Sequence, residues 1–101
     1  MDPSLKELAG VIRERYPDRL KQILFFGSRV RGDASAESDC DCILIFREVS
    51  QDLKRDVDKL AAGLLVDRGL VLSCIVLSEN DLERLQYEPF LQNARREGIA
   101  A

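Results

Sequence analysis

Residues 25–46 read FFGSRVRGDASAESDCDCILIF, and this stretch decides the fold that the sequence predicts. It begins at the end of one apolar run, KQILFF at residues 21–26, and ends in a second, DCILIF at residues 41–46. Short apolar runs bounded by glycine or polar residues are typical of buried strands. Between the runs lie a Gly-Ser pair, two arginines and two aspartates one residue apart. We therefore expect two buried strands joined by a polar segment that carries chemistry.

The segments on either side of this stretch predict two amphipathic helices. Apolar side chains at helical spacing predict a helix from residue 4 to about residue 15, which Pro17 ends. Ser50 is placed to cap a longer helix that ends at Arg68-Gly69. Its apolar side chains recur on one face, so we expect core packing there. That face consists of Leu53, Val57, Leu60, Ala61, Leu64 and Leu65.

The C-terminal third of the chain predicts one more strand and two short helices. The run LVLSCIVL at residues 70–77 is expected to be the third strand. Ser78 with Asp81 forms a capping pattern for the next helix, and a last helix is bounded by Pro89 and Gly98. The order of elements predicts an α+β fold: a small mixed sheet of three or four strands with helices packed on it.

Length and composition predict one globular domain over residues 1–101, with 46% hydrophobic and 33% charged residues. No apolar run approaches the roughly 20 residues of a bilayer span, so we expect a cytoplasmic protein without a membrane partner. The net charge of −3 gives no reason to expect direct binding of nucleic acid. The chain has no histidine, which excludes Ser-His-Asp and Cys-His catalysis and histidine-containing metal sites within it.

The three cysteines, Cys40, Cys42 and Cys74, lie in apolar segments. Their number is odd, so they do not form a disulfide framework. Cys40 and Cys42 project to the same face of a strand, but further ligands for a zinc site are not evident. We expect reduced thiols in the core.

The Gly27-Ser28 pair follows the first strand and precedes a short helix that we expect over residues 29–32. Glycine allows the backbone to approach a ligand closely, and the free amides at a helix start favour anions such as phosphate. Ser28 adds a hydroxyl donor. Many tight turns have the same sequence, so the pair alone does not establish a site.

Asp39 and Asp41 stand at the entrance of the second strand. Residues two apart in a strand project to the same face, with roughly 7 Å between their α-carbons. The two carboxylates repel one another, so a positive partner is expected, either an arginine or a divalent metal. Magnesium suits paired carboxylates together with substrate phosphates. In the alternative interpretation, the aspartates only begin the strand and face water.

The combined pattern Gly-Ser-x10-Asp-x-Asp resembles the nucleotidyltransferase superfamily that includes DNA polymerase beta. It is most similar to the small bacterial and archaeal branch, the minimal nucleotidyltransferase (MNT) domains. Arg31-Gly32 within the pattern and Ser38 before the first aspartate also resemble this branch. The tail EPFLQNARREGIAA is similar to a common ending of the same proteins. The resemblance extends over about nine tenths of the chain.

The resemblance implies a polymerase beta-like fold and a role for each residue of the pattern. Gly27 and Ser28 would hold the β- and γ-phosphates of a nucleoside triphosphate, with ATP as the expected substrate. Asp39 and Asp41 would be the catalytic residues and would bind two Mg²⁺ ions. Neutralised charge and in-line geometry, which paired metals supply, are the main requirements of nucleotidyl transfer.

Two arginines flank the phosphate turn. Arg29 and Arg31 would add positive charge to the triphosphate, although arginines on a short helix are usually solvated.

One departure from the family pattern leaves two functions open. Polymerase-like members place a third carboxylate on the next strand, where this chain has LVLSCIVL, and Ser73 is the expected occupant of that position. Serine is a poorer base and a poorer metal ligand. The chain would therefore be either an enzyme that transfers AMP or another nucleotide to a protein hydroxyl, or a weakly active or inactive nucleotide-binding antitoxin.

In both cases the resemblance implies a partner, a small helical HEPN-domain protein that the MNT domain neutralises. Apolar residues on the last two helices are candidates for contact with such a partner, although core packing is expected for most of them. These residues are Leu85, Tyr87, Phe90 and Leu91.

Overall fold

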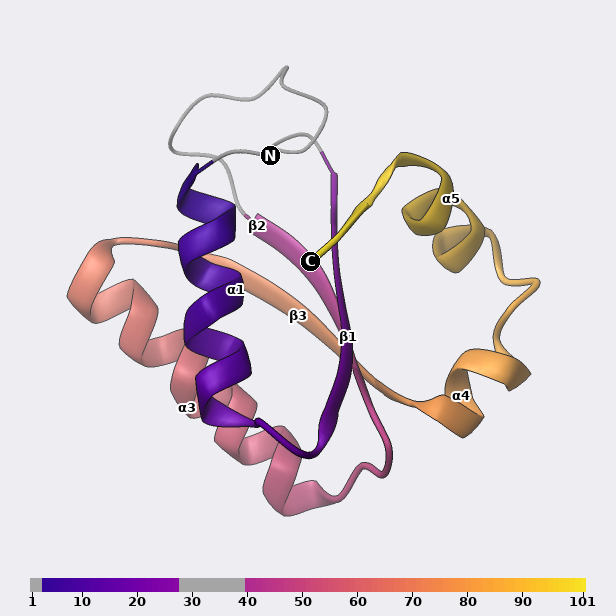
Figure 1. Cartoon of the computed structure of the whole chain (residues 1–101), viewed down its shortest axis with the longest axis horizontal. Helices are drawn as coiled ribbons and strands as arrows, with labels where there is room; N and C mark the ends of the chain where they lie inside the picture. Colours follow the sequence, from indigo (N-terminus) through magenta and orange to yellow (C-terminus); the bar gives the residue numbers. More distant parts are fainter. Residues whose placement is uncertain (1–2, 28–39) are drawn as a thin grey trace.

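A computed structural model describes residues 3–27 and 40–101 as an α+β fold with one four-stranded mixed sheet (Figure 1). Its strands, in the spatial order β3-β2-β1-β4, are β3 Leu72–Ser78, β2 Cys40–Phe46, β1 Leu20–Phe26 and β4 Ile99–Ala100. Its helices are α1 Pro3–Arg15, α3 Gln51–Arg68, α4 Glu79–Arg84 and α5 Pro89–Glu97. The predicted fold class is confirmed.

The central strand β2 fixes the register of the sheet. It pairs antiparallel with β1, where Asp41 lies opposite Phe26, and parallel with β3, where Asp41 lies beside Ser73. Strand β1 also pairs antiparallel with β4, so the sheet is mixed. Both predicted strands begin one residue earlier than expected: the first begins at Leu20 and the second at Cys40.

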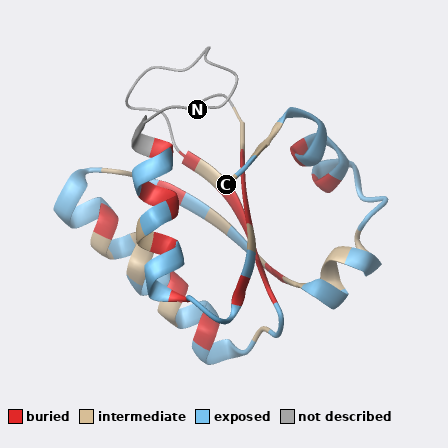
Figure 2. Ribbon diagram, viewed as in Figure 1, coloured by how far each residue is buried: buried red, intermediate tan, exposed pale blue. Residues whose placement is uncertain are grey.

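Helices cover both faces of the sheet: α1 and α3 lie on one face, and α4 and α5 on the other (Figure 1). Alternate residues of β2 serve the two cores. Cys42 and Leu44 pack with α1 and α3, while Ile43 and Ile45 pack with the side of α4 and α5. Figure 2 shows the resulting buried stripe along the middle of the sheet. Burial on both faces explains why this strand is apolar without alternation.

Helix α3 begins and ends as its sequence predicts. The Ser50 hydroxyl accepts a hydrogen bond from the Leu53 amide at 3.1 Å, and Gly69 ends the helix with a left-handed φ of 64°. The Leu70 amide donates to the Leu64 carbonyl at 3.3 Å, which ties the next residues to the helix end. The third strand therefore begins at Leu72 and not at residue 70.

The predicted apolar face of α3 is correct except at its end. Leu53, Val57 and Leu64 are buried, and Leu60 and Ala61 pack partly against the same core. Leu65 was expected to join them, but 52% of its surface is exposed. At 100° per residue, Leu64 lies in the middle of this face, whereas Leu65 lies at its edge, beyond Ala61 and farther from the sheet.

The predicted cap of the next helix is confirmed as a reciprocal pair. The Asp81 amide donates to the Ser78 hydroxyl at 3.0 Å, and the Ser78 amide donates to the Asp81 carboxylate at 3.1 Å. Ser78 is thus both the last residue of β3 and the cap of α4.

The end of the chain differs from the expectation in one respect. Gly98 follows α5, as predicted, but the chain then forms β4 against Leu24 and Phe25. The backbone of Gly98 is extended (φ −81°), so left-handed geometry does not explain the glycine. A Cβ there would lie 2.7 Å from the Phe25 carbonyl oxygen and would overlap the Ala94 carbonyl. The absence of a side chain is what lets the end of the chain join the sheet.

The cysteines are reduced thiols, as predicted, and none of the three forms a disulfide. Cys40 and Cys42 are buried, and Cys74 is half-buried. The Cys42 and Cys74 sulfurs lie 3.2 Å apart because these residues are neighbours in the parallel β2–β3 register. The hydrogen bond with Cys74, and then burial, raise the pKa of the Cys42 thiol, so it remains protonated. No helix in the described part of the chain is long and apolar enough to cross a bilayer.

Candidate functional site

Asp41 is the acidic residue that the structure places at the entrance of the central strand. As the second residue of β2 it is half-buried. Strand alternation puts it on the same face as Ile43 and Ile45, which is the face that α4 and α5 cover farther along the strand. A carboxylate is therefore held on a rigid strand and keeps access to solvent.

Gly27, which directly follows β1, lies against the side chain of Asp41. Its φ is +87°, a conformation that residues with a side chain rarely adopt. A Cβ at this position would overlap the Asp41 Oδ2 atom and would lie 3.4 Å from Cγ. Glycine is thus required twice, by the turn and by the neighbouring carboxylate. Sequence reasoning expected this glycine to make room for a ligand, but the group it first makes room for is Asp41.

The strand next to Asp41 carries the serine that the sequence predicted. Ser73 is aligned with Asp41 in the parallel register, on the same face, and is exposed. Asp67 lies in α3 and Glu79 in the first turn of α4, as expected. Within residues 3–27 and 40–101, no three acidic, cysteine or histidine side chains gather closely enough to hold a metal ion. At the entrance of β2 the described residues therefore provide the Asp41 carboxylate and the Ser73 hydroxyl. The acidic residue that polymerase-like members place on the next strand is replaced here by Ser73.

The remaining predicted site residues lie outside the described residues. They are Ser28, Arg29, Arg31 and Asp39, together with the short helix expected over residues 29–32. Their roles stay predictions. The chain leaves the described sheet at Gly27 and returns to it at Cys40, next to Asp41, so both ends of this segment lie at the same end of the sheet.

Sequence reasoning missed one charged cluster, which lies away from the Gly27 turn. The Arg15 guanidinium donates to both oxygens of Asp56, at 2.7 and 3.2 Å, and the Tyr16 hydroxyl donates to the same carboxylate at 2.6 Å. The hydrogen bond from Arg15, followed by that from Tyr16, lowers the pKa of Asp56 to about 2. Burial, followed by the bond to Asp56, raises the pKa of Tyr16 to about 12.

This cluster has a structural role. It joins the end of α1 to α3 across residues far apart in the sequence, and the Tyr16 ring packs edge-to-face on Phe46, with centroids 5.2 Å apart. Ion pairs of this kind shift pKa values without serving catalysis.

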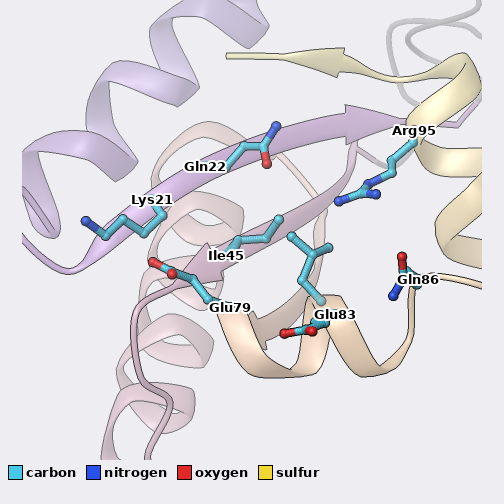
Figure 3. Close-up of a pocket in the computed structure, with 8 residues that line it drawn as sticks. Lys21, Gln22, Ile45, Glu79, Glu83, Gln86 and Arg95 are labelled. Carbon is cyan, nitrogen blue, oxygen red and sulfur yellow. The ribbon is translucent and has the colours of Figure 1, made fainter.

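A surface groove of about 610 Å³ lies toward the other end of the sheet (Figure 3). Its walls come from β1, α4 and α5, with Lys21 and Glu79 on one side and Arg95 and Gln86 on the other. Ile45, four residues along β2 from Asp41, contributes to its lining. At about 3.3 Å per residue these two α-carbons are roughly 13 Å apart. The groove is therefore separate from the Asp41 site, and its mixed charges favour no single kind of ligand.

The sequence matches a known family over most of its length. The profile of the nucleotidyltransferase domain family covers residues 5–98. A provisionally named protein adenylyltransferase of Methanocaldococcus jannaschii, MJ0604, is 36% identical over 97 residues, which is 96% of this chain and 93% of the relative.

Solved structures share the fold at lower sequence identity. A toxin–antitoxin complex crystallised with AMP-PNP contains a chain with a TM-score of 0.66 and 18% identity. A mutant of the toxin–antitoxin MntA-HpeT gives a TM-score of 0.65 and 16% identity. In both cases the match covers 94% of this chain and 69% of the other.

Proposed function

Because this chain belongs to the nucleotidyltransferase domain family, as a minimal nucleotidyltransferase domain, we propose that it transfers AMP from ATP to a hydroxyl group of a partner protein. The observation that carries the proposal is the packing of the Gly27 turn against the Asp41 carboxylate at the entrance of β2. A backbone turn without a side chain and a rigid carboxylate suit a polyphosphate and its counter-ions.

The proposed division of labour follows the sequence pattern. Gly27 and Ser28 hold the terminal phosphates, and Arg29 and Arg31 add positive charge to them. The half-exposed Asp41 fits a magnesium ligand, since Mg²⁺ prefers oxygen donors and is commonly held by one or two carboxylates together with substrate phosphates.

In this proposal, Asp39 joins Asp41 as the second carboxylate. Bound magnesium, two ions in this assignment, would supply charge neutralisation at the triphosphate.

The reaction exchanges a phosphoanhydride bond of ATP for a phosphate ester bond to the acceptor. The acceptor oxygen bonds to the α-phosphorus, the bond to the bridging oxygen of the β-phosphate breaks, and pyrophosphate leaves. The hydroxyl proton passes to solvent, because Ser73 is a poor proton acceptor in the position next to Asp41. We therefore expect slow turnover. A positioned base commonly contributes a factor on the order of 100 to 10,000 in rate.

The choice of AMP and of a protein acceptor draws on the relatives. MJ0604 is named as a protein adenylyltransferase, and one structural neighbour was crystallised with AMP-PNP. Both structural neighbours are toxin–antitoxin complexes, which favours a toxin as the acceptor, and we propose a small helical HEPN-domain protein.

Two exposed aromatic residues offer a contact surface for the partner. Tyr87 and Phe90 are 79% and 41% exposed, whereas Leu91 is buried and Leu85 is half-buried against the core. Of the four apolar residues considered for contact, the two aromatics are therefore the ones available.

A second function is favoured by the serine beside Asp41. If the absent carboxylate abolishes turnover, the chain would bind ATP and Mg²⁺ and neutralise its partner by contact alone. The two functions differ in whether nucleotide reaches the partner, and both require the Asp41 site.

The test is transfer of label from [α-³²P]ATP to the helical protein encoded beside this chain, with both proteins co-purified. We expect label on the partner with the wild type and with Asp67→Asn, a control that removes a carboxylate from α3. Label should be lost with Asp41→Asn. Co-purification without label would favour the binding module, and equal labelling by Asp41→Asn would refute the site.

A further inference from the structure

The two edges of the sheet are built very differently. One edge consists of β4 and the part of β1 that β4 leaves uncovered, and the other edge is β3 (Figure 1). An edge strand presents backbone N–H and C=O groups that can pair with another chain. Proteins usually protect such edges with short strands, bulges, lysine or proline.

The β1–β4 edge carries three of these protections. Strand β4 has only two residues, which pair with Leu24 and Phe25. The register between β1 and β2 shifts between Leu20 and Gln22, which is a bulge. The residue within that shift is Lys21, whose side chain is exposed. Another strand would find little regular backbone to pair with here.

The β3 edge has none of these protections: it is not short, it has no bulge, and it contains no lysine or proline. Its seven residues, LSCIVLS at 72–78, include no charged residue, proline or glycine, and they pair with β2 without a register shift. Ile75, at the centre, is 36% exposed, and its neighbour Ser73 is exposed and small. A long, regular and uncharged edge strand with an exposed isoleucine is suited to pairing with another strand.

The hydrogen-bond direction shows which groups of β3 face outward. The Cys40 amide donates to the Val71 carbonyl, which fixes the alternation of the parallel pair. By this alternation Ser73 and Ile75 turn their backbone groups toward β2, and Cys74 and Val76 turn theirs away. Strand β3 is at the end of the sheet and pairs with β2 on its inner side. On its outer side, no strand formed by residues 3–27 and 40–101 pairs with it.

We propose that β3 is a homodimerisation edge, on which a second copy of this chain pairs antiparallel with Ile75 at the two-fold axis. In this register Cys74 lies opposite Val76 of the second copy, and both residues turn their backbone groups outward. Each such pair exchanges two hydrogen bonds. Ile75 lies opposite its own copy, as a closely spaced pair that buries the exposed side chains.

The strand favours a second copy because it is complementary to itself. In the antiparallel register about Ile75, Ser73 lies opposite Leu77 and Leu72 lies opposite Ser78, so no charged residue of the strand meets a like charge. The two four-stranded sheets become one continuous sheet.

The two-fold axis is perpendicular to the joined sheet, so each face of the joined sheet is formed by the same face of both copies. Both Asp41 carboxylates therefore lie on the same side, with one β3 strand between each of them and the junction. The proposal does not depend on the chemistry assigned to Asp41.

Size-exclusion chromatography with light scattering tests the proposal on the whole chain. We expect the wild type to become dimeric as its concentration rises into the range of tens to hundreds of micromolar. Ile75→Lys should remain monomeric, because two ammonium groups would meet at the axis. Val66→Lys is the matched control, since Val66 is an 82% exposed β-branched residue on α3, and it should dimerise like the wild type.

A cross-linking variant gives a second test that does not require a disruptive substitution. Two cysteines at an antiparallel, closely spaced pair have α-carbons about 4.5 Å apart, within the range of a disulfide. Ile75→Cys treated with diamide, which accepts the two electrons and two protons, should give a covalent dimer. Val66→Cys and the wild type provide the background.

Three results would overturn the proposal. They are a wild type that stays monomeric throughout the concentration range, a dimer that survives Ile75→Lys, or Ile75→Cys that cross-links no better than Val66→Cys. If Ile75→Lys fails to fold, as judged by circular dichroism, the cross-linking yield decides.

Discussion

Replacement of Gly27 by alanine separates the two demands that the structure makes on this residue. At a φ of +87° an L-residue is strained by about 1–2 kcal/mol. For a domain of this size, each kcal/mol lowers Tm by about 4–8 °C, so a fall of about 4–16 °C is expected. The new methyl group also overlaps the Asp41 Oδ2 atom, so the carboxylate must rotate away from the turn.

The matched control is Gly69→Ala. Gly69 has a similar positive φ of 64°, but a Cβ there meets nothing within 4 Å. Both variants should therefore lose similar stability in thermal unfolding followed by circular dichroism. The two should differ in ligand binding, because only Gly27→Ala displaces a predicted magnesium ligand.

Calorimetric titration with ATP and Mg²⁺, well below the Tm of either variant, measures that difference. We expect Gly69→Ala to bind like the wild type and Gly27→Ala to bind at least about tenfold more weakly, a loss of about 1.4 kcal/mol or more. Wild-type affinity in Gly27→Ala would refute the reasoning. Equal weakening in both variants would show that the effect is global and not local to Asp41.

Three further predictions concern the scaffold. Gly98→Ala places a methyl group against two backbone carbonyls that cannot rotate away, so chemical denaturation should show a loss of about 1–3 kcal/mol; unchanged stability would contradict the close approach. The lowered pKa of Asp56 stabilises the fold above its unfolded pKa of about 4, and this contribution disappears as pH falls toward 2. The Tm of Asp56→Asn should therefore depend less on pH between about 4 and 2 than the Tm of the wild type. Asp52→Asn, which changes a 94% exposed side chain, is the control and should behave like the wild type. The same pH dependence in all three proteins would exclude a stabilising role for Asp56. Finally, the half-buried Cys74 should react with a maleimide in the native protein, whereas the buried Cys40 and Cys42 should react only after unfolding. Mass spectrometry of peptides measures the three rates. Equal rates in the native protein would contradict the packing of β2.

Much of the fold could be predicted because its signals are local. The apolar runs that became β1 and β2, the Ser50 cap and the Ser78–Asp81 capping pair each depend on a few neighbouring residues. Strand β4 could not be predicted, since two residues carry no periodic pattern and its pairing depends on the distant Leu24 and Phe25.

The start of β3 was misplaced for a different reason. The amide of Leu70 hydrogen-bonds back to the helix end, and an apolar sequence does not reveal such a bond.

The proximity of some candidate residues could be predicted, whereas their roles stay predictions. The resemblance to the nucleotidyltransferase superfamily implied that a turn glycine and a strand carboxylate belong to one site, and the structure places Gly27 against Asp41. The position of Ser73 beside Asp41 was also anticipated, because the resemblance implied a polar residue at this place in the third strand and Ser73, unlike Cys74, carries a hydroxyl. The steric reason for Gly27 could not be predicted, because it depends on how the end of β1 meets β2. The Arg15–Asp56–Tyr16 cluster joins elements far apart in the sequence and gave no local signal.

The central claim is that Asp41 and the Gly27 turn hold metal and triphosphate together. Its most direct test is anomalous diffraction from crystals grown with Mn²⁺, in place of Mg²⁺, and AMP-PNP. We predict an anomalous peak within about 2.0–2.3 Å of an Asp41 carboxylate oxygen and of a nucleotide phosphate oxygen, with the phosphates beside Gly27. A nucleotide bound elsewhere, or one bound at Gly27 with no metal at Asp41, would contradict the account.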